Sequence, residues 1–279
     1  MAPLPLTSLQ NPLCKRVRKA AEGKDREAFL LEGRHLLAEA LAAGWPLLAV
    51  LVRLDRWPEW SARLLPLVDE GRVFLVPPRL VEKLATQPAS EGLLALAARR
   101  PSPLPDLPSP RGYLYLDAVQ DPVNVGILVR SARAFGLAGV LAGQGTADPF
   151  RGQALSRSAG AAFQIPIWPV KVPEFLSWAG KKGVTLLAAN ARGEPLPRAT
   201  LPQGPYALVL GNEGRGLSPE LLERCVRRVA VPMVAGWDSL NVAVAGSILM
   251  AHLSSLRFPP GERRKTSPDG ILDSREPRP

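Results

Sequence analysis

The feature that most limits the folds open to this chain is a repeated alternation of short apolar runs with longer amphipathic stretches. Apolar runs occur at residues 113–119, 138–143, 165–170, 184–190, 206–211 and 228–233, and helical patterns occur at 124–136, 151–162, 173–182 and 218–226 and again after residue 238. Apolar runs of this kind are typical of strands buried on both faces, and strands that alternate with helices form parallel sheets. The pattern predicts a doubly wound parallel α/β domain.

The first hundred residues show the same alternation on a smaller scale. Strands are predicted at 28–31, 46–54, 72–77 and 92–99, and helices at 34–43, 60–68 and 79–84. Five prolines between residues 101 and 110 exclude a helix or an inner strand there. We therefore predict a smaller N-terminal α/β domain at 1–100, a stiff linker at 101–111, a larger domain at 112–258 with a core of its own, and a polar, disordered tail at 259–279.

Composition narrows the class of protein. The 279 residues carry a formal net charge of +10 and contain only two cysteines and two histidines. The charge favours a polyanionic partner, most simply nucleic acid, and the scarcity of ligands argues against a metal site. Except for a marginal match in the last helix, no stretch is long and apolar enough to span a membrane, and no secretion signal begins the chain. We expect a cytoplasmic protein with no membrane and no metal.

A basic cluster near the N-terminus is the first candidate contact with nucleic acid. Lys15, Arg16, Arg18 and Lys19 fall within five residues. The cluster suits the binding of RNA phosphates, but a solvated helix face explains it equally well.

The loops after the strands of the larger domain are the places to search for a site, because parallel sheets bind ligands beyond the carboxyl ends of their strands. Four of the five asparagines of the chain lie in these loops: Asn124, Asn190, Asn212 and Asn241. Asparagine also favours turns and caps, which accounts for part of this clustering. The rest indicates amide recognition of a nucleoside-like ligand.

Two of these loops have further features. Residues 211–216, GNEGRG, combine glycines that allow close backbone approach with the carboxylate of Glu213. The loop before the last helix offers Asp238 or Ser239 as a cap, and it also offers a helix N-terminus that can bind a polar or anionic group. A dinucleotide site is the obvious alternative, but no glycine run has the G-x-G-x-x-G spacing and no Walker-type loop occurs.

Taken together, these loops resemble three motifs of the SpoU/TrmH family of RNA ribose 2′-O-methyltransferases, within the SPOUT superfamily. DAVQDPVNVGILVRSARAFG (117–136) resembles the first motif, LVLGNEGRGLS (208–218) the second and VPMVAGWDSLNVAVA (231–245) the third. RSAGA (157–161) and FLLEGRHLLAEAL (29–41) also resemble family segments, the latter in a ribosomal-protein-like RNA-binding domain.

The resemblance implies a parallel sheet with a deep trefoil knot, S-adenosylmethionine as cofactor, and a homodimer that completes its active site across the subunits. It implies methyl transfer to a ribose 2′-hydroxyl of RNA, most simply ribosomal RNA. The residues it implies for catalysis are Asn124, Arg130, Glu213, Ser239 and Asn241. Those implied for the cofactor are Ala189, Asn190, Leu210, Gly211, Asn212, Gly214, Val231, Met233, Ser239 and Leu240, and those expected for RNA are Lys15, Arg16, Arg18, Lys19, Arg34 and Arg157.

Arg130 carries the sharpest expectation. It follows Asn124 on one predicted helix, and we expect both side chains to point into the same cleft. A guanidinium, whose pKa exceeds ~12, is a poor general base, so alignment of the phosphate and hydroxyl is the alternative role. The competing functions are a non-catalytic RNA-binding protein of this fold and a nucleotide-dependent oxidoreductase.

Overall fold

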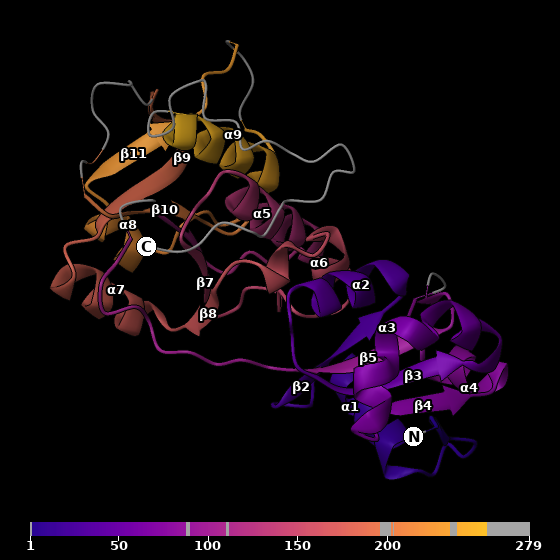
Figure 1. Ribbon diagram of the computed structural model, residues 1–279. Helices are drawn as coiled ribbons and strands as arrows, with labels where there is room; N and C mark the ends of the chain where they lie inside the picture. The colour runs from indigo at the N-terminus through magenta and orange to yellow at the C-terminus, as the bar shows by residue number, and fades with distance from the viewer. Residues whose placement is uncertain are drawn as a thin grey trace.

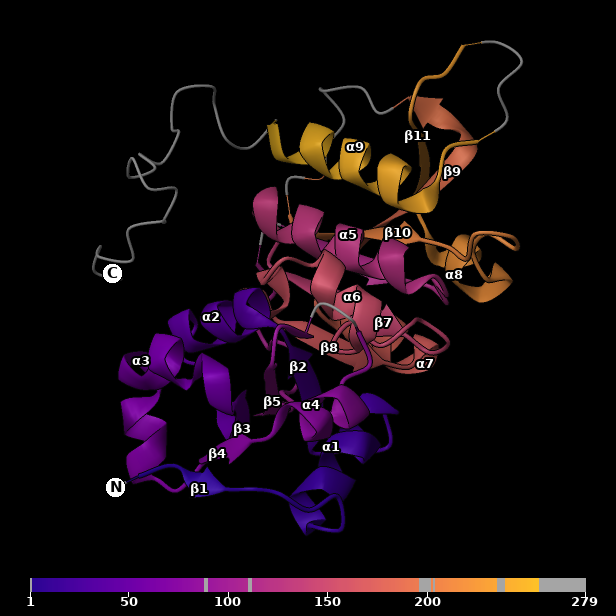
Figure 2. The same cartoon turned by 90° about the vertical axis from the view of Figure 1, so that its right-hand side faces the viewer.

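Two sheets, each covered by helices on both faces, make up the protein (Figure 1). The computed structural model describes residues 2–87, 90–109, 112–195, 202, 204–234 and 239–255. The predicted tail at 259–279 lies outside these residues, as do Asp238 and the last two residues of the predicted linker. Figure 2 shows the same arrangement from the side, with the N-terminal sheet below the C-terminal one.

The N-terminal sheet has five strands in the order β1-β4-β3-β5-β2. β1, β4 and β3 are parallel, whereas β5 runs antiparallel to both β3 and β2. Apolar residues of α2 and α3 pack on one face of this sheet and those of α1 and α4 on the other. The elements are β1 (Leu4–Pro5), α1 (Pro12–Ala21), β2 (Ala28–Glu32), α2 (Arg34–Ala42), β3 (Leu47–Arg53), α3 (Trp57–Asp69), β4 (Val73–Val76), α4 (Pro78–Leu84) and β5 (Leu93–Ala98).

The C-terminal sheet has six strands in the order β11-β9-β10-β6-β7-β8, all of them parallel. Helices α5, α6 and α9 cover one face, and α7 and α8 cover the other. The predicted parallel sheet is therefore confirmed. The elements are β6 (Tyr113–Leu116), α5 (Pro122–Ala134), β7 (Gly139–Gly143), α6 (Gly152–Arg157), β8 (Ile167–Val170), α7 (Val172–Lys181), β9 (Thr185–Pro195), β10 (Tyr206–Leu210), α8 (Pro219–Arg224), β11 (Arg227–Ala230) and α9 (Val242–Ser255).

Local signals explain where the helix that follows β6 begins and ends. The Asp121 carboxylate accepts the backbone N–H of Val123 at 2.8 Å, and Pro122 occupies the first helical position. The chain leaves the helix at Gly136, whose φ of +72° suits only glycine. These signals fix the start of α5 beside the carboxyl ends of β6 and β10.

Three predicted elements differ from the observed ones. The helix predicted at 151–162 stops at Arg157, because Ala159 and Gly160 take left-handed φ values and Gly160 packs against Glu39 of the N-terminal half. The last predicted strand, 228–233, ends at Ala230. The strand predicted at 184–190 continues to Pro195 as β9, where its outer part pairs with β11 after a shift of register.

One layer of the core runs through both halves of the chain. The ring of Phe29 on β2 lies 4.9 Å from that of Phe150, and the ring of Trp45 lies 5.4 Å from that of Phe163. Beside them, Arg99 forms an ion pair with Asp148 at 2.5 Å. The expectation of two separately cored units is therefore wrong, since the aromatic side chains that close the N-terminal core pack on those of the C-terminal half.

The proline-rich segment is attached to the C-terminal half. The indole N–H groups of Trp168 and Trp178 donate to the carbonyls of Pro103 and Pro105 at 3.1 and 2.9 Å, and Leu104 packs beside them. These contacts give the stretch before residue 110 a defined path along the surface of the parallel sheet.

Candidate active site

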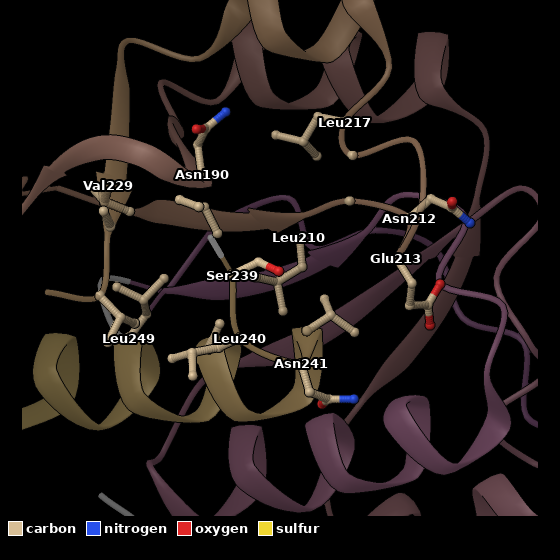
Figure 3. A pocket seen from close by; sticks show the side chains of 18 of the residues that line it. Asn190, Leu210, Asn212, Glu213, Leu217, Val229, Ser239, Leu240, Asn241 and Leu249 are labelled. Carbon is tan, nitrogen blue, oxygen red and sulfur yellow. The ribbon is translucent and has the colours of Figure 1, made fainter. Parts of the chain in front are cut away.

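A cavity of about 440 Å³ lies at the carboxyl edge of the parallel sheet, between β9, β10, β11 and the start of α9. In Figure 3, Asn190 and Leu217 form one wall, while Leu240, Asn241 and Leu249 lie on the opposite side with α9. Ser239 lies between them. Three segments that are far apart in the sequence meet here because parallel strands place their following loops at one edge.

Most of the residues implied for the cofactor line this cavity. They are Ala189, Asn190, Leu210, Gly211, Asn212, Val231, Met233, Ser239 and Leu240. Gly214 is outside the lining, in the turn between Asn212 and Gly216. Of the residues implied for catalysis, Glu213, Ser239 and Asn241 line the cavity, whereas Asn124 and Arg130 do not.

The glycine-rich loop after β10 is held tightly. Asn212 and Gly216 exchange two backbone hydrogen bonds of 2.9 Å. A Cβ added to Gly211 would lie 2.3 Å from the Gly216 carbonyl carbon, whereas one added to Gly214 would come no closer than 3.7 Å to any atom. Only Gly211 is therefore required for this close approach of the backbone.

The side chain of Asn212 makes its hydrogen bonds to the backbone of its own loop and of the loop after β6. Its side-chain carbonyl accepts the backbone N–H groups of Gly214 and Arg215, and its NH₂ group donates to the Ala118 carbonyl at 2.8 Å. Asn190 similarly accepts the backbone N–H of Arg192 at 2.8 Å. The clustering of asparagines thus reflects loop geometry at these two positions, and their side chains shape the cavity by holding the backbone around it.

A chain of amide hydrogen bonds joins the three motifs. Asn241 caps α9, with its carbonyl accepting from Ala243 and Val244, and its NH₂ group donates to the Asn124 carbonyl at 3.0 Å. Asn124, only 3% exposed, donates in turn to the Glu213 carboxylate at 3.0 Å. The cap of α9 is thus Asn241, and the expectation that Asp238 or Ser239 fills this place is wrong.

Glu213 is fixed as an anion at the end of this chain. Partial burial of its carboxylate opposes ionisation, but hydrogen bonds from Asn124 and from the backbone N–H groups of Gln120 and Asp121 outweigh it and hold the pKa below its usual value. An ionised carboxylate with this many donors is a weak proton acceptor at neutral pH. Its contribution is to lock the loop after β10 onto the start of α5.

Arg130 lies elsewhere on α5. Six residues correspond to about 120° around an α-helix, so the side chains of Asn124 and Arg130 point in different directions. Asn124 is buried and Arg130 is exposed, with no hydrogen bond or ion pair to any described residue. The expectation that both enter one cleft is therefore wrong for a single chain.

The residues expected to bind RNA fall in three places. Lys15, Arg18 and Lys19 are exposed at positions one turn apart on α1, whereas Arg16 is engaged by Asp25 at 2.9 Å and by Glu27 at 3.2 Å. Arg34 forms an ion pair with Glu91 at 3.1 Å. Arg157 is exposed at the end of α6, against Gly126 of α5.

Sequence reasoning missed two sets of residues at the site. One is the apolar part of the cavity lining, which includes Val229, Val242, Ala245 and Leu249. The other is the pair of backbone N–H groups at Gln120 and Asp121 that hold Glu213. A signal for the second set was present, since these residues directly precede the proline that begins α5.

Within the described residues, no group of histidine, cysteine and acidic side chains is placed to hold a metal ion. The helices of the same residues are all too short or too polar to cross a membrane.

Comparison with known proteins accounts for both halves of the chain. Residues 112–251, which contain the whole cavity, match the SpoU rRNA Methylase family. The chain belongs to this family. Residues 11–95 match the MRM3-like substrate binding domain, so the SpoU methylase region is preceded by a unit found in other proteins as a substrate-binding domain.

Relatives and solved structures of SpoU methylases agree with this assignment. The chain is 32% identical to the 23S rRNA (guanosine(2553)-2'-O)-methyltransferase RlmP of Bacillus subtilis, over 89% of this chain and 98% of that protein. The AdoMet-bound rRNA methyltransferase of Sinorhizobium meliloti is 28% identical, with a TM-score of 0.78, and the match covers 91% of this chain and 97% of that one. The predicted family is confirmed, as is an α/β fold with a parallel-sheet SpoU region after an N-terminal substrate-binding domain. The alternative of a nucleotide-dependent oxidoreductase is excluded.

Proposed function

We propose that this protein transfers a methyl group from S-adenosylmethionine to a ribose 2′-hydroxyl of RNA, most simply ribosomal RNA. The observation that carries the proposal is the cavity at the carboxyl edge of the parallel sheet, whose walls come from the motifs that resemble this family. The names of the Bacillus subtilis and Sinorhizobium meliloti relatives support the substrate and the cofactor.

The cavity suits this cofactor in size and chemistry. Its volume of about 440 Å³ lies within the roughly 300–1,000 Å³ typical of small-molecule sites. Leu210, Val229 and Leu249 provide apolar walls, and Asn190, Asn212, Ser239 and Asn241 add polar residues to the lining. When bound, the cofactor supplies an electrophilic methyl group on a sulfonium centre.

The remaining roles belong to the side chains of this chain. The Asn241–Asn124–Glu213 chain holds the wall at the start of α9 against the loop after β10, and so keeps the cavity in one shape. Arg130 aligns the RNA, with its planar fork bridging a phosphate and the reacting hydroxyl. Ser239, exposed at the mouth of the cavity, contacts the incoming nucleotide.

A second copy of the chain completes the site in this proposal. Ile127 of α5 and Val244 and Ile248 of α9 are 37%, 47% and 43% exposed, and Ser131 and Ser247 hydrogen-bond at 2.7 Å between the same two helices. Arg130 is one helical turn from Ile127, at the edge of this apolar surface. A homodimer that covers the surface brings Arg130 of one subunit to the cavity of the other.

In this proposal each of the predicted segments has its own role. Residues 1–100 bind the RNA substrate, 101–111 connect the halves, and 112–258 form the methyltransferase, with its C-terminal segment threaded into a deep trefoil knot. The exposed cations of α1 support the first role. RNA as substrate supports a cytoplasmic enzyme.

The proposal is tested by two measurements on the full chain. Calorimetry should show binding of S-adenosylmethionine, and incubation with deproteinised rRNA should give a single new 2′-O-methylated nucleotide by mapping. Cofactor binding without methylation of either rRNA or tRNA would favour the non-catalytic RNA-binding protein. No cofactor binding would refute the proposal.

A further inference from the structure

A second cavity, of about 390 Å³, lies at the junction of the two halves, away from the proposed active site. It is bounded by the end of α1, by β2, by the residues after α4 and by the start of α6. Its lining residues are Ala20, Ala21, Glu22, Leu30, Glu32, Thr86, Phe150, Arg151 and Gly152. None of them is among the residues that sequence reasoning assigned to RNA, cofactor or catalysis.

The walls combine an aromatic ring with fixed hydrogen-bonding groups. Phe150 is half-buried, with one part of its surface packed on Phe29 and another part lining the cavity. The Glu32 carboxylate accepts the backbone N–H of Thr86 at 2.6 Å and its hydroxyl at 2.5 Å. Each carboxylate oxygen keeps a further lone pair, so Glu32 can still accept N–H groups from a ligand.

The cation at the rim is held across the junction. Nε of Arg151 donates to the Ala21 carbonyl at 3.3 Å, and its side chain packs over Gly23. Within the described residues Arg151 makes no ion pair, and Glu22, which lines the same cavity, interacts with it only through its charge. The guanidinium can therefore still bind a phosphate. Arg18, exposed on α1, adds a second cation near Glu22, which is itself paired with Lys24 at 2.6 Å.

The cavity has a defined shape because its two sides are packed together. The Phe29–Phe150 contact and the Arg99–Asp148 ion pair fix the start of α6 against β2. α6 then runs from this junction to α5 (Figure 2). Arg157 at the end of α6 lies against Gly126 of α5, and Arg130 follows Gly126 by one turn. A single short helix therefore separates this cavity from the helix that carries Arg130.

We propose that the junction cavity binds one unpaired nucleotide of the RNA substrate, at a position other than the methylated one. The base stacks against Phe150 and donates its amino group to Glu32, while Arg151 and Arg18 bind the flanking phosphates. A carboxylate accepts from the exocyclic amino group of cytosine, adenine or guanine, whereas uracil offers it only the ring N3–H between two carbonyls, so the site prefers the first three. The inference rests on the proposed function, because it takes RNA as the substrate.

Two variants of the full chain test the site by independent means. Ala21→Leu places extra bulk in the cavity, and Glu32→Gln removes the acceptor charge while keeping an amide beside Thr86. Each should raise the Kd for deproteinised 23S rRNA by about tenfold, Ala21→Leu because the base can no longer stack on Phe150, and Glu32→Gln because the base loses its charged acceptor. The KM for rRNA should rise with it, whereas kcat at saturating RNA and the Kd for S-adenosylmethionine should stay at wild-type values.

The controls separate failure of this inference from failure of the function. Ala62→Leu adds the same bulk at an exposed position of α3 and should leave rRNA binding unchanged. In competition experiments, poly(A) and poly(C) should displace rRNA from the wild type better than poly(U). In Glu32→Gln the three polymers should displace rRNA more nearly equally. Wild-type binding of rRNA with both variants within twofold of it would overturn the junction site alone. Absence of rRNA binding by the wild type would overturn the proposed function.

Discussion

The two sheets have similar apolar strands and similar covering helices, yet among the described residues they differ in the space where several strands end together. In the N-terminal sheet, β5 is antiparallel to both of its neighbours, so the carboxyl ends of the strands do not all lie at one edge. Polar residues there pair with one another, as Arg34 does with Glu91 beside a cavity of only about 160 Å³. In the C-terminal sheet every strand is parallel, and three loops converge on about 440 Å³. Strand direction, more than composition, decides which half has room for a cofactor.

The two halves are nevertheless not independent, because they share one layer of core. The sequence pattern that suggests two domains therefore gives a single packed body. In this body the N-terminal half packs against the half that contains the larger cavity. Four kinds of variant should show how far the two halves differ. They change the shared core layer, Arg130 on α5, the glycine-rich loop at residues 211–216, and the basic side chains of α1.

The largest effect is expected at the shared layer. Phe29→Ala removes a fully buried ring that packs on Phe150 and Phe163, and it should lower the free energy of unfolding by about 3–5 kcal/mol. Denaturant unfolding followed by circular dichroism and by tryptophan fluorescence should show one transition that moves as a whole. Two transitions, of which only one moves, would mean that the halves unfold independently despite their contact.

Arg130 should have the largest effect on catalysis. Under the proposed function, Arg130→Ala should lower kcat by at least about a hundredfold and leave the Kd for S-adenosylmethionine near wild type, because the contact matters in the transition state. Arg130→Lys should restore little of the lost kcat, since an ammonium group lacks the planar fork of a guanidinium. The thermal midpoint should not change, as Arg130 is exposed and unpaired among the described residues. Single-turnover methylation within about threefold of wild type would remove Arg130 from the mechanism.

The glycine loop tests whether the cavity holds the cofactor. Gly211→Ala brings a methyl group against the backbone of Gly216 and Leu217 and should weaken binding of S-adenosylmethionine by at least about tenfold, or ~1.4 kcal/mol. Gly214→Ala, three residues away with open space around its Cβ, is the matched control and should bind normally. Equal affinities in calorimetry would place the cofactor elsewhere.

The smallest effect concerns the basic helix. Replacing Lys15, Arg18 and Lys19 with glutamine should reduce the slope of log Kd for RNA against log salt by about two to three, as expected for the loss of that many phosphate contacts. Arg16→Gln is the comparison, because Arg16 is already paired with Asp25 and Glu27 and should change the slope little. A slope that is the same in all variants would make α1 an ordinary solvated helix.

Much of the fold could be predicted from the sequence, because the signals are local. The apolar runs 113–116 and 206–210 are buried strands, and the chain leaves α2 and α5 at Gly44 and Gly136. The break of α6 at Arg157 could not be predicted in this way. It depends on Gly160 meeting Glu39, a residue about 120 positions away in the chain.

In the candidate site, too, some features could be predicted from the sequence and others could not. The sequence by itself determined the parallel sheet, the family motifs and most of the residues that line the cavity, because each depends on the order and spacing of residue types along one segment. Only the tertiary structure decided that Asn241 caps α9 and binds Asn124, that Arg130 points away from the cavity of its own chain, and that a second cavity lies between the halves. These features depend on which side chains from distant segments meet. The packing of α5 against α9 fixes the first two, and the packing of the two halves against each other fixes the third.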